Sequence, residues 1–165
     1  MADTRPSLVE AAGELARYVG AVSLLMVAAI HAQQYYDAFF KEVPTIGRLF
    51  MLNIVGAGVA GLVLLAPVRL LGSRLGNLIY LGAALLGIAV SAGAFAALVY
   101  SEYYPLFGFM ESGYRLAIEL ALLFEGVSTV LLAGFAASIL LGGRKSRRGG
   151  AADVRTRPPR LEHAA

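Results

Sequence analysis

Residues 116–141 read LAIELALLFEGVSTVLLAGFAASILL, a long apolar run with Glu125 about ten residues inside it. A helix needs about 20 residues to cross the hydrocarbon core of a bilayer, which is about 30 Å thick. At a rise of about 1.5 Å per residue, Glu125 would therefore lie near the middle of the membrane. A carboxylate at that depth is costly and normally faces a partner or a cavity, so Glu125 is the first candidate for a functional residue.

Three further apolar runs precede this one, at residues 18–40, 49–66 and 75–100. Hydrophobic residues make up 58% of the chain and the mean hydropathy is +0.70, which is typical of a membrane protein. We expect an all-α, four-helix transmembrane bundle at residues 15–142, with helices at about 15–40, 49–66, 75–100 and 115–141. Residues 1–14 would form a cytoplasmic segment before it. Residues 143–165 would form a disordered basic tail, because they carry charge, Gly and Pro without apolar periodicity.

The basic residues are distributed unequally along this four-helix plan. Eleven Lys or Arg residues fall on one side of the plan: Arg5 and Arg17 at the N-terminal end, two in the loop between helices 2 and 3, and seven in the C-terminal tail. Only three fall in the other two loops. Basic residues flanking membrane helices concentrate on the cytoplasmic side. The sequence therefore predicts a multi-pass protein of the cell inner (plasma) membrane with both termini in the cytoplasm and acidic, aromatic loops outside.

Few polar residues lie at membrane depth, and all of them fall in the outer half or near the midplane. They are His31 at the end of helix 1, Asn53 in helix 2, and Glu119 and Glu125 in helix 4. We expect them to converge on one pocket open to the outside. Two interpretations remain open for Glu125: a protonatable functional site, or a hydrogen-bond network that fixes helix pairing. For Glu119 the structural interpretation is favoured, because its side chain can reach the lipid headgroups or Arg115.

Several classes of chemistry have no support in the sequence. There is no cysteine, which removes disulfides, iron–sulfur clusters and thiol chemistry. No phosphate-binding glycine motif, no convincing metal-ligand spacing and no nucleophile–base–acid arrangement is present. We therefore expect neither an enzyme nor a bound cofactor. The basic tail next to a helix end favours anionic lipids over nucleic acid as its partner.

Small residues recur at a spacing of about four on three of the predicted helices, and they allow helices to approach closely in lipid. These residues are Asn53, Ala57 and Gly61, then Ala83, Gly87 and Ser91, then Gly134 and Ser138. The faces can meet within one chain, or between chains in a homo-oligomer or with another membrane protein. The sequence favours a non-enzymatic membrane accessory or interaction protein. The alternative is a small proton-coupled transporter with Glu125 as its protonatable site.

Two segments carry a resemblance to known proteins. They are HAQQYYDAFFKEVPTIGRLFMLN (His31–Asn53) and FGFMESGYR (Phe107–Arg115), the second followed by Glu125. They resemble uncharacterised small four-helix integral membrane proteins of high-GC Gram-positive bacteria, with a looser likeness in layout to DoxX-type proteins. The resemblance implies the four-helix architecture and no activity. It draws attention to His31, Asn53 and Glu125, and to the external-loop residues Pro44, Gly47 and Glu111.

Overall fold

Four long helices form the fold. The computed structural model describes residues 8–111, 113 and 115–156, with side chains as far as Gly142. The helices are α1 (Leu8–Asp37), α2 (Pro44–Leu65), α3 (Ser73–Tyr103) and α4 (Leu116–Thr156). Short 3-10 turns, η1 (Phe40–Glu42) and η2 (Val68–Leu71), join α1 to α2 and α2 to α3. The predicted all-α four-helix bundle is confirmed.

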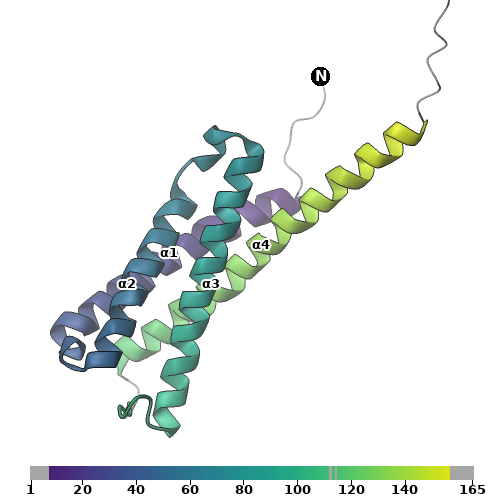
Figure 1. Cartoon of the computed structure of the whole chain (residues 1–165). Helices are drawn as coiled ribbons and strands as arrows, with labels where there is room; N and C mark the ends of the chain where they lie inside the picture. Colours follow the sequence, from purple (N-terminus) through teal and green to yellow (C-terminus); the bar gives the residue numbers. More distant parts are fainter. Residues whose placement is uncertain (1–7, 112, 114, 157–165) are drawn as a thin grey trace, which may run out of the picture.

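The helices are arranged as a closed ring. Each helix packs against the next along the chain, and α1 also packs against α4. Figure 1 shows that η1 and the α3–α4 loop lie at one end of the bundle. The start of α1 and η2 lie at the other end, from which α4 projects (Figure 1). We call these the η1 end and the η2 end.

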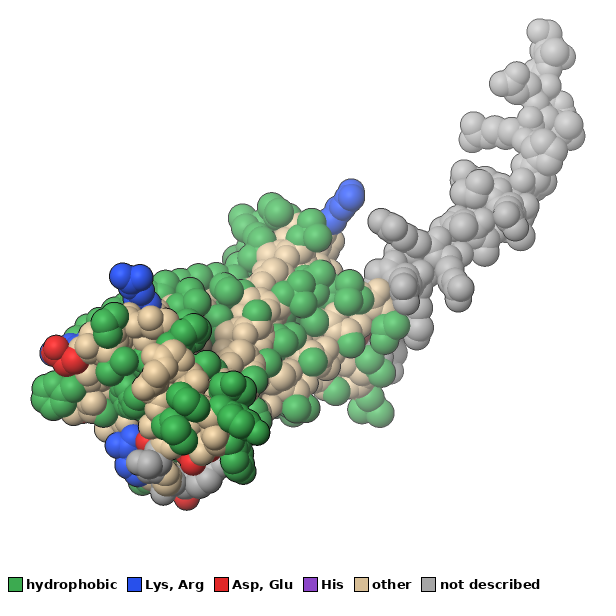
Figure 2. Space-filling model, turned by 60° about the horizontal axis from the view of Figure 1, so that its bottom comes forward, with side chains coloured by type: hydrophobic (Ala, Val, Ile, Leu, Met, Phe, Trp, Pro, Cys, Tyr) green, Lys and Arg blue, Asp and Glu red, His purple; other side chains and the backbone are tan. Residues whose placement is uncertain are grey.

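The outer surface of the bundle is apolar. All four helices, α4 as far as Gly142, are long and apolar enough to cross a membrane. Large apolar side chains project outward from every helix, among them Val22, Leu62, Leu85 and Val130. On the face in Figure 2, charged side chains lie at the ends of the bundle and the body between them is apolar. Such an apolar outer surface is stable against the hydrocarbon chains of a bilayer and unfavourable in water. The chain is therefore a multi-pass membrane protein.

Several helix ends differ from those predicted. The helix α1 begins at Leu8 and ends at Asp37, so residues 8–14 belong to the bundle, while residues 1–7 lie outside the described part. The helix α2 begins at Pro44, since proline fits the first turn of a helix, where its missing N–H is not needed. The backbone of α4 is helical as far as Thr156, where we expected disorder from residue 143. Arg, Lys and Ala, which favour helix, are frequent there, and residues 157–165 lie outside the described part.

Most of the small-residue positions pack inside this one chain. A Cβ added at Gly61 of α2 would lie 2.9 Å from Leu25 Cδ2 of α1. A Cβ at Gly87 of α3 would lie 2.6 Å from Leu24 Cδ1 of α1 and 2.9 Å from Leu132 Cδ1 of α4. These approaches are closer than any real Cβ tolerates, so the glycines let the helices meet. Gly134, in contrast, has open space around its Cα.

Candidate functional site

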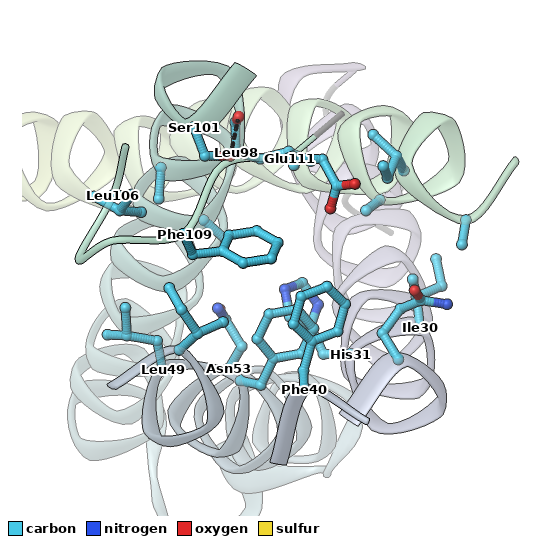
Figure 3. Close-up of a pocket in the computed structure, with 18 of the residues that line it drawn as sticks. Ile30, His31, Phe40, Leu49, Asn53, Leu98, Ser101, Leu106, Phe109 and Glu111 are labelled. Atoms are coloured by element: carbon cyan, nitrogen blue, oxygen red, sulfur yellow. Dashed lines mark hydrogen bonds between the residues drawn. The ribbon is translucent and has the colours of Figure 1, made fainter. Parts of the chain in front are cut away.

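A cavity of about 100 Å³ lies among the four helices at the η1 end. Most of its lining is apolar, from Ile30 on α1 to Ala121 on α4. The polar residues in its lining are His31, Gln34, Asn53, Ser101, Glu111 and Glu125. Figure 3 shows the rings of Phe40 and Phe109 together at this cavity, with His31 and Asn53 beside them. The predicted convergence on one pocket is therefore found for His31, Asn53 and Glu125.

Two polar side chains of the lining, His31 of α1 and Glu125 of α4, lie close together. His31 Nε2 lies 3.6 Å from Glu125 Oε1, and the side chains are 10% and 1% exposed. The other ring nitrogen, Nδ1, lies 2.9 Å from the carbonyl oxygen of Val27. Because a carbonyl oxygen only accepts, Nδ1 must be the donor, which leaves Nε2 of a neutral ring as an acceptor. The lone pair of Nε2 therefore faces a carboxyl oxygen.

The second carboxyl oxygen of Glu125 is also unsatisfied. Oε2 is buried and has no hydrogen-bond partner within the described residues. The neighbouring hydroxyl of Ser128 does not serve it, because it donates to Ser91 Oγ at 2.8 Å and lies 3.1 Å from the backbone oxygen of Glu125. Polar groups in the hydrocarbon region are normally satisfied internally, so this carboxyl group is an exception that needs a reason.

Three phenylalanines cover the cavity. The rings of Phe40 and Phe50 are stacked with their centres 4.7 Å apart, and Phe109 meets Phe40 edge-on at 5.3 Å. The ring of His31 contacts Phe50 at 5.0 Å. Sequence reasoning missed this cover, since it placed aromatic residues in the external loops without predicting that any of them lies over the cavity. The one available signal was the resemblance, whose segments contain all three phenylalanines.

Local backbone geometry places two of these rings. Phe39, just before η1, has φ 60°, a left-handed conformation that turns the chain so that Phe40 points inward and is buried. Phe107 and Gly108 have φ 51° and 80°, and Leu106 and Phe109 exchange two backbone hydrogen bonds across them at 2.7 and 3.0 Å. Positive φ at both central residues is the pattern of a type I′ turn, which folds Phe109 back over the cavity.

The external-loop candidates have separate places around this cap. Glu111 lines the cavity and pairs with Arg115 at 3.1 Å. Gly47 lies in the first turns of α2 under η1, where an added Cβ would be 2.9 Å from the backbone oxygen of Phe40. Pro44 begins α2 and is exposed. Pro44 and Gly47 therefore support the cap and do not line the cavity.

The expectation that Glu119 joins this site is not met. Glu119 is exposed on α4 and is not among the lining residues. Six helical residues turn the chain by about 600°, so Glu119 and Glu125 point about 120° apart. Arg115, the partner considered for Glu119, contacts Glu111 instead.

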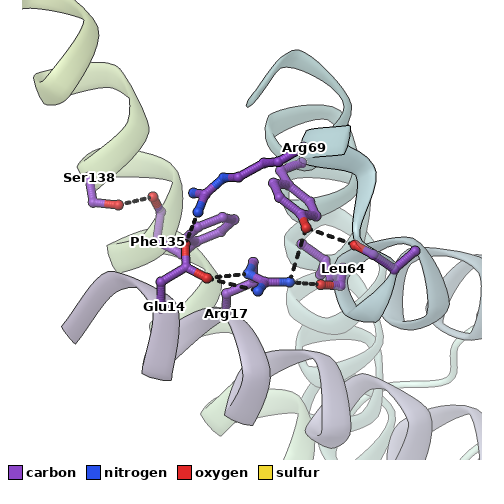
Figure 4. A network of polar contacts seen from close by, with 8 residues as sticks. Glu14, Arg17, Leu64, Arg69, Phe135 and Ser138 are labelled. Carbon is purple, nitrogen blue, oxygen red and sulfur yellow. Dashed lines mark hydrogen bonds and ion pairs between the residues drawn. The ribbon is translucent and has the colours of Figure 1, made fainter. Parts of the chain in front are cut away.

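A second polar cluster at the η2 end was also missed. Arg17, which we had counted only as a topology signal, is 4% exposed. Its guanidinium contacts Glu14 at 2.8 Å, the hydroxyl of Tyr80 at 3.3 Å and the backbone oxygen of Leu64 (Figure 4). Arg69 reaches the other oxygen of Glu14 at 2.6 Å. The donors of Arg17 and Arg69 are hydrogen-bonded or paired with acceptors in this cluster, so the cluster connects α1 to α2, η2 and α3.

The comparisons with known proteins give no further guide. No family model matches the chain, and neither a curated protein nor a solved structure is significantly similar to it. Groups of three or more metal-ligating side chains are absent from the described residues. What the site does must therefore be argued from its own geometry.

Proposed function

We propose that this protein is a non-enzymatic accessory protein of the plasma membrane that binds a small ligand from the outer side. The observation that carries the proposal is the His31–Glu125 pair, buried in a cavity at the η1 end of the bundle. Charge asymmetry supports the orientation, since the η2 end adjoins the basic loop and tail and would face the cytoplasm. The cavity then faces outward.

The packing below the cavity supports binding over transport. Leu24, Leu132, Tyr80 and Phe135 are at most 2% exposed and fill the bundle toward the η2 end. The Arg17 cluster closes that end. A ligand in the cavity therefore has no path through the bundle, and a carrier would have to separate helices that the glycine contacts hold together.

The proton-coupled transporter remains the second candidate, because Glu125 is a protonatable group held inside the membrane. It requires access to the cavity from both sides in turn. An interaction with another membrane protein, or with a second copy of the chain, would use the outer faces of the helices. The face of α4 around Gly134 is one such face, because the space next to this glycine is open.

Cysteine labelling separates these functions, because the chain has no cysteine of its own. Ala97→Cys places a thiol in the cavity lining on α3, and Ala84→Cys places a control thiol in the closed core of the same helix. The probe is a membrane-impermeant cationic methanethiosulfonate, applied to right-side-out and inside-out vesicles. We expect Ala97→Cys to react from outside only and Ala84→Cys to react from neither side. Reaction of Ala97→Cys from both sides would establish alternating access. If Ala97→Cys reacted from neither side, the cavity would not be accessible to a ligand and the proposed function would be wrong.

A further inference from the structure

We propose that the cavity binds a small primary ammonium ion, with Glu125 as its counter-ion and the three phenylalanines as its cover. This inference rests on the proposed function, since it names the ligand class of the same site. It begins from the mismatch between His31 and Glu125. At 3.6 Å the two atoms are too far apart for a direct hydrogen bond, and when Glu125 is ionised and His31 is neutral both are acceptors, so a donor placed between them would serve both.

A guest with several N–H groups supplies what is missing. One ammonium nitrogen can lie within hydrogen-bond distance of both Nε2 of His31 and Oε1 of Glu125, because atoms 3.6 Å apart can share a donor group at about 2.9 Å from each. A third N–H is then free for Oε2, which is buried without a partner in the described part of the chain. A positive charge on the guest also offsets the cost of an ionised carboxylate at this depth.

The charges around the cavity exclude the opposite ligand class. The lining contains two carboxylates, Glu111 and Glu125, and no Lys or Arg among the described residues. Arg115, which lines the neighbouring outer hollow, is half exposed and paired with Glu111. An anion would therefore meet two acidic groups and no counter-ion.

The phenylalanine cover and the size of the cavity indicate what kind of alkyl group the ammonium ligand carries. The faces of the rings of Phe40, Phe50 and Phe109 attract a cation, and the rings also pack against an alkyl chain. A cavity of about 150 Å³ holds benzene, so one of about 100 Å³ suits a chain of about four carbons. An outer hollow, which Arg115 also lines, shares Phe40, Phe109 and Glu111 with the cavity, so a guest entering from this hollow would pass these three residues.

Binding should weaken in acid. The titratable groups that face the guest are Glu125 of α4, His31 of α1 and Glu111 of the α3–α4 loop, while α2 and α3 contribute Asn53 and Ser101, which do not titrate. Protonation of either carboxylate removes an attractive charge. Protonation of His31 replaces an acceptor with a repelling cation. All three changes act in the same direction.

The test uses the purified full-length chain in nanodiscs, with butylammonium chloride as the probe and 1-butanol and butyrate as neutral and anionic matches. Calorimetry at constant ionic strength should show butylammonium binding at least tenfold tighter than butanol, and no binding of butyrate. Glu125→Gln, which keeps the shape of the side chain, should abolish this preference. Glu119→Gln removes an exposed carboxylate of the same helix and should leave it unchanged.

A second measurement does not depend on the folding of the Glu125 variant. Butylammonium should slow the outside labelling of Ala97→Cys at least tenfold, and butanol at the same concentration should not. Equal binding or protection by butanol, or an unchanged preference in Glu125→Gln, overturns the ammonium proposal. If Ala97→Cys is labelled from outside but is not protected, this inference fails and the proposed function stands. If it is not labelled at all, both fail.

Discussion

Gly47 offers a direct test of how the phenylalanine cover is held. In Gly47→Ala, the new Cβ would lie 2.9 Å from the backbone oxygen of Phe40, 3.2 Å from Cα of Lys41 and 3.3 Å from its backbone oxygen. These are backbone atoms, which cannot rotate away as a side chain can. The η1 turn must therefore move outward, and the ring of Phe40 moves with it.

The size of the effect follows from two opposing terms. Replacing Gly with Ala inside a helix stabilises it by about 1 kcal/mol. Forcing an extra methyl into a packed site costs about 1–3 kcal/mol, and the backbone contacts place this case in the upper half. Gly58 of α2 is the matched control, because an added Cβ there meets only Cβ of Ala28 at 4.0 Å, an ordinary contact. The gain of about 1 kcal/mol from replacing Gly with Ala in a helix is the same in both variants and cancels when they are compared. Gly47→Ala should therefore be about 2–3 kcal/mol less stable than Gly58→Ala.

Unfolding in mixed micelles by increasing SDS, followed by circular dichroism, measures this difference. The chain lacks tryptophan, so the helical signal is the better probe. Gly47→Ala should also increase the labelling rate of Ala97→Cys severalfold, since the cover is displaced. Equal stability of the two glycine variants would refute the claim that η1 is held by its contact with α2.

Three further predictions concern the rest of the bundle. Arg17→Met keeps the apolar stem but loses the hydrogen bonds to Glu14, Tyr80 and Leu64, and should cost about 2 kcal/mol in the same assay; a neutral result would mean that the cluster does not hold α1. Ser91→Ala removes the α3–α4 hydrogen bond and should cost about 0.6–1.7 kcal/mol, whereas Ser138→Ala, whose hydroxyl bonds only its own helix, should change little. Truncation at residue 143 should leave a folded bundle in detergent and weaken sedimentation with anionic liposomes, since each basic residue near a lipid surface contributes about 1 kcal/mol; unfolding on truncation would show that the tail is structural.

Much of the fold could be predicted because length and hydropathy alone specify membrane helices. The four apolar runs correspond to the four helices. The ends were less accurate, because local composition does not decide where a helix stops. The run from residue 143 to 156 looked unstructured by charge, yet its backbone continues α4.

The candidate site was partly predictable for a related reason. Depth in the membrane identified Glu125, and the position of His31 near the end of helix 1 placed it on the same side. The sequence could not show that the two side chains meet, since that depends on how α1 and α4 are rotated. The same limit explains the error at Glu119, and it explains why Arg17, near the end of an apolar run, was not expected to be buried.

Whether Glu125 serves structure or function can be decided by Glu125→Leu. At the η2 end, each buried donor of Arg17 has an acceptor, which is how a structural polar group is satisfied in lipid. At the η1 end, no direct hydrogen bond joins His31 to Glu125, and Oε2 of Glu125 has no partner among the described residues. The contact between α1 and α4 is already made by apolar packing, as at Gly20, where an added Cβ would lie 2.8 Å from Leu132 Cδ2. A leucine at position 125 removes the buried acid and leaves one unpaired ring nitrogen, at a cost of about 1 kcal/mol.

Replacing a whole buried ion pair with apolar residues of similar size is often neutral or stabilises a protein by about 1–4 kcal/mol, whereas removing one partner costs about 3–5 kcal/mol because the other charge is left unpaired. His31 can stay neutral once Glu125 is replaced, so Glu125→Leu leaves no unpaired charge. We therefore expect Glu125→Leu to unfold at the same SDS concentration as the parent chain or a higher one, while losing protection of Ala97→Cys by butylammonium. Gain of stability with loss of binding is the usual sign of a residue kept for function. A loss of about 3 kcal/mol or more would instead mean that Glu125 holds the helices together, since removing one partner of a buried structural ion pair costs about 3–5 kcal/mol.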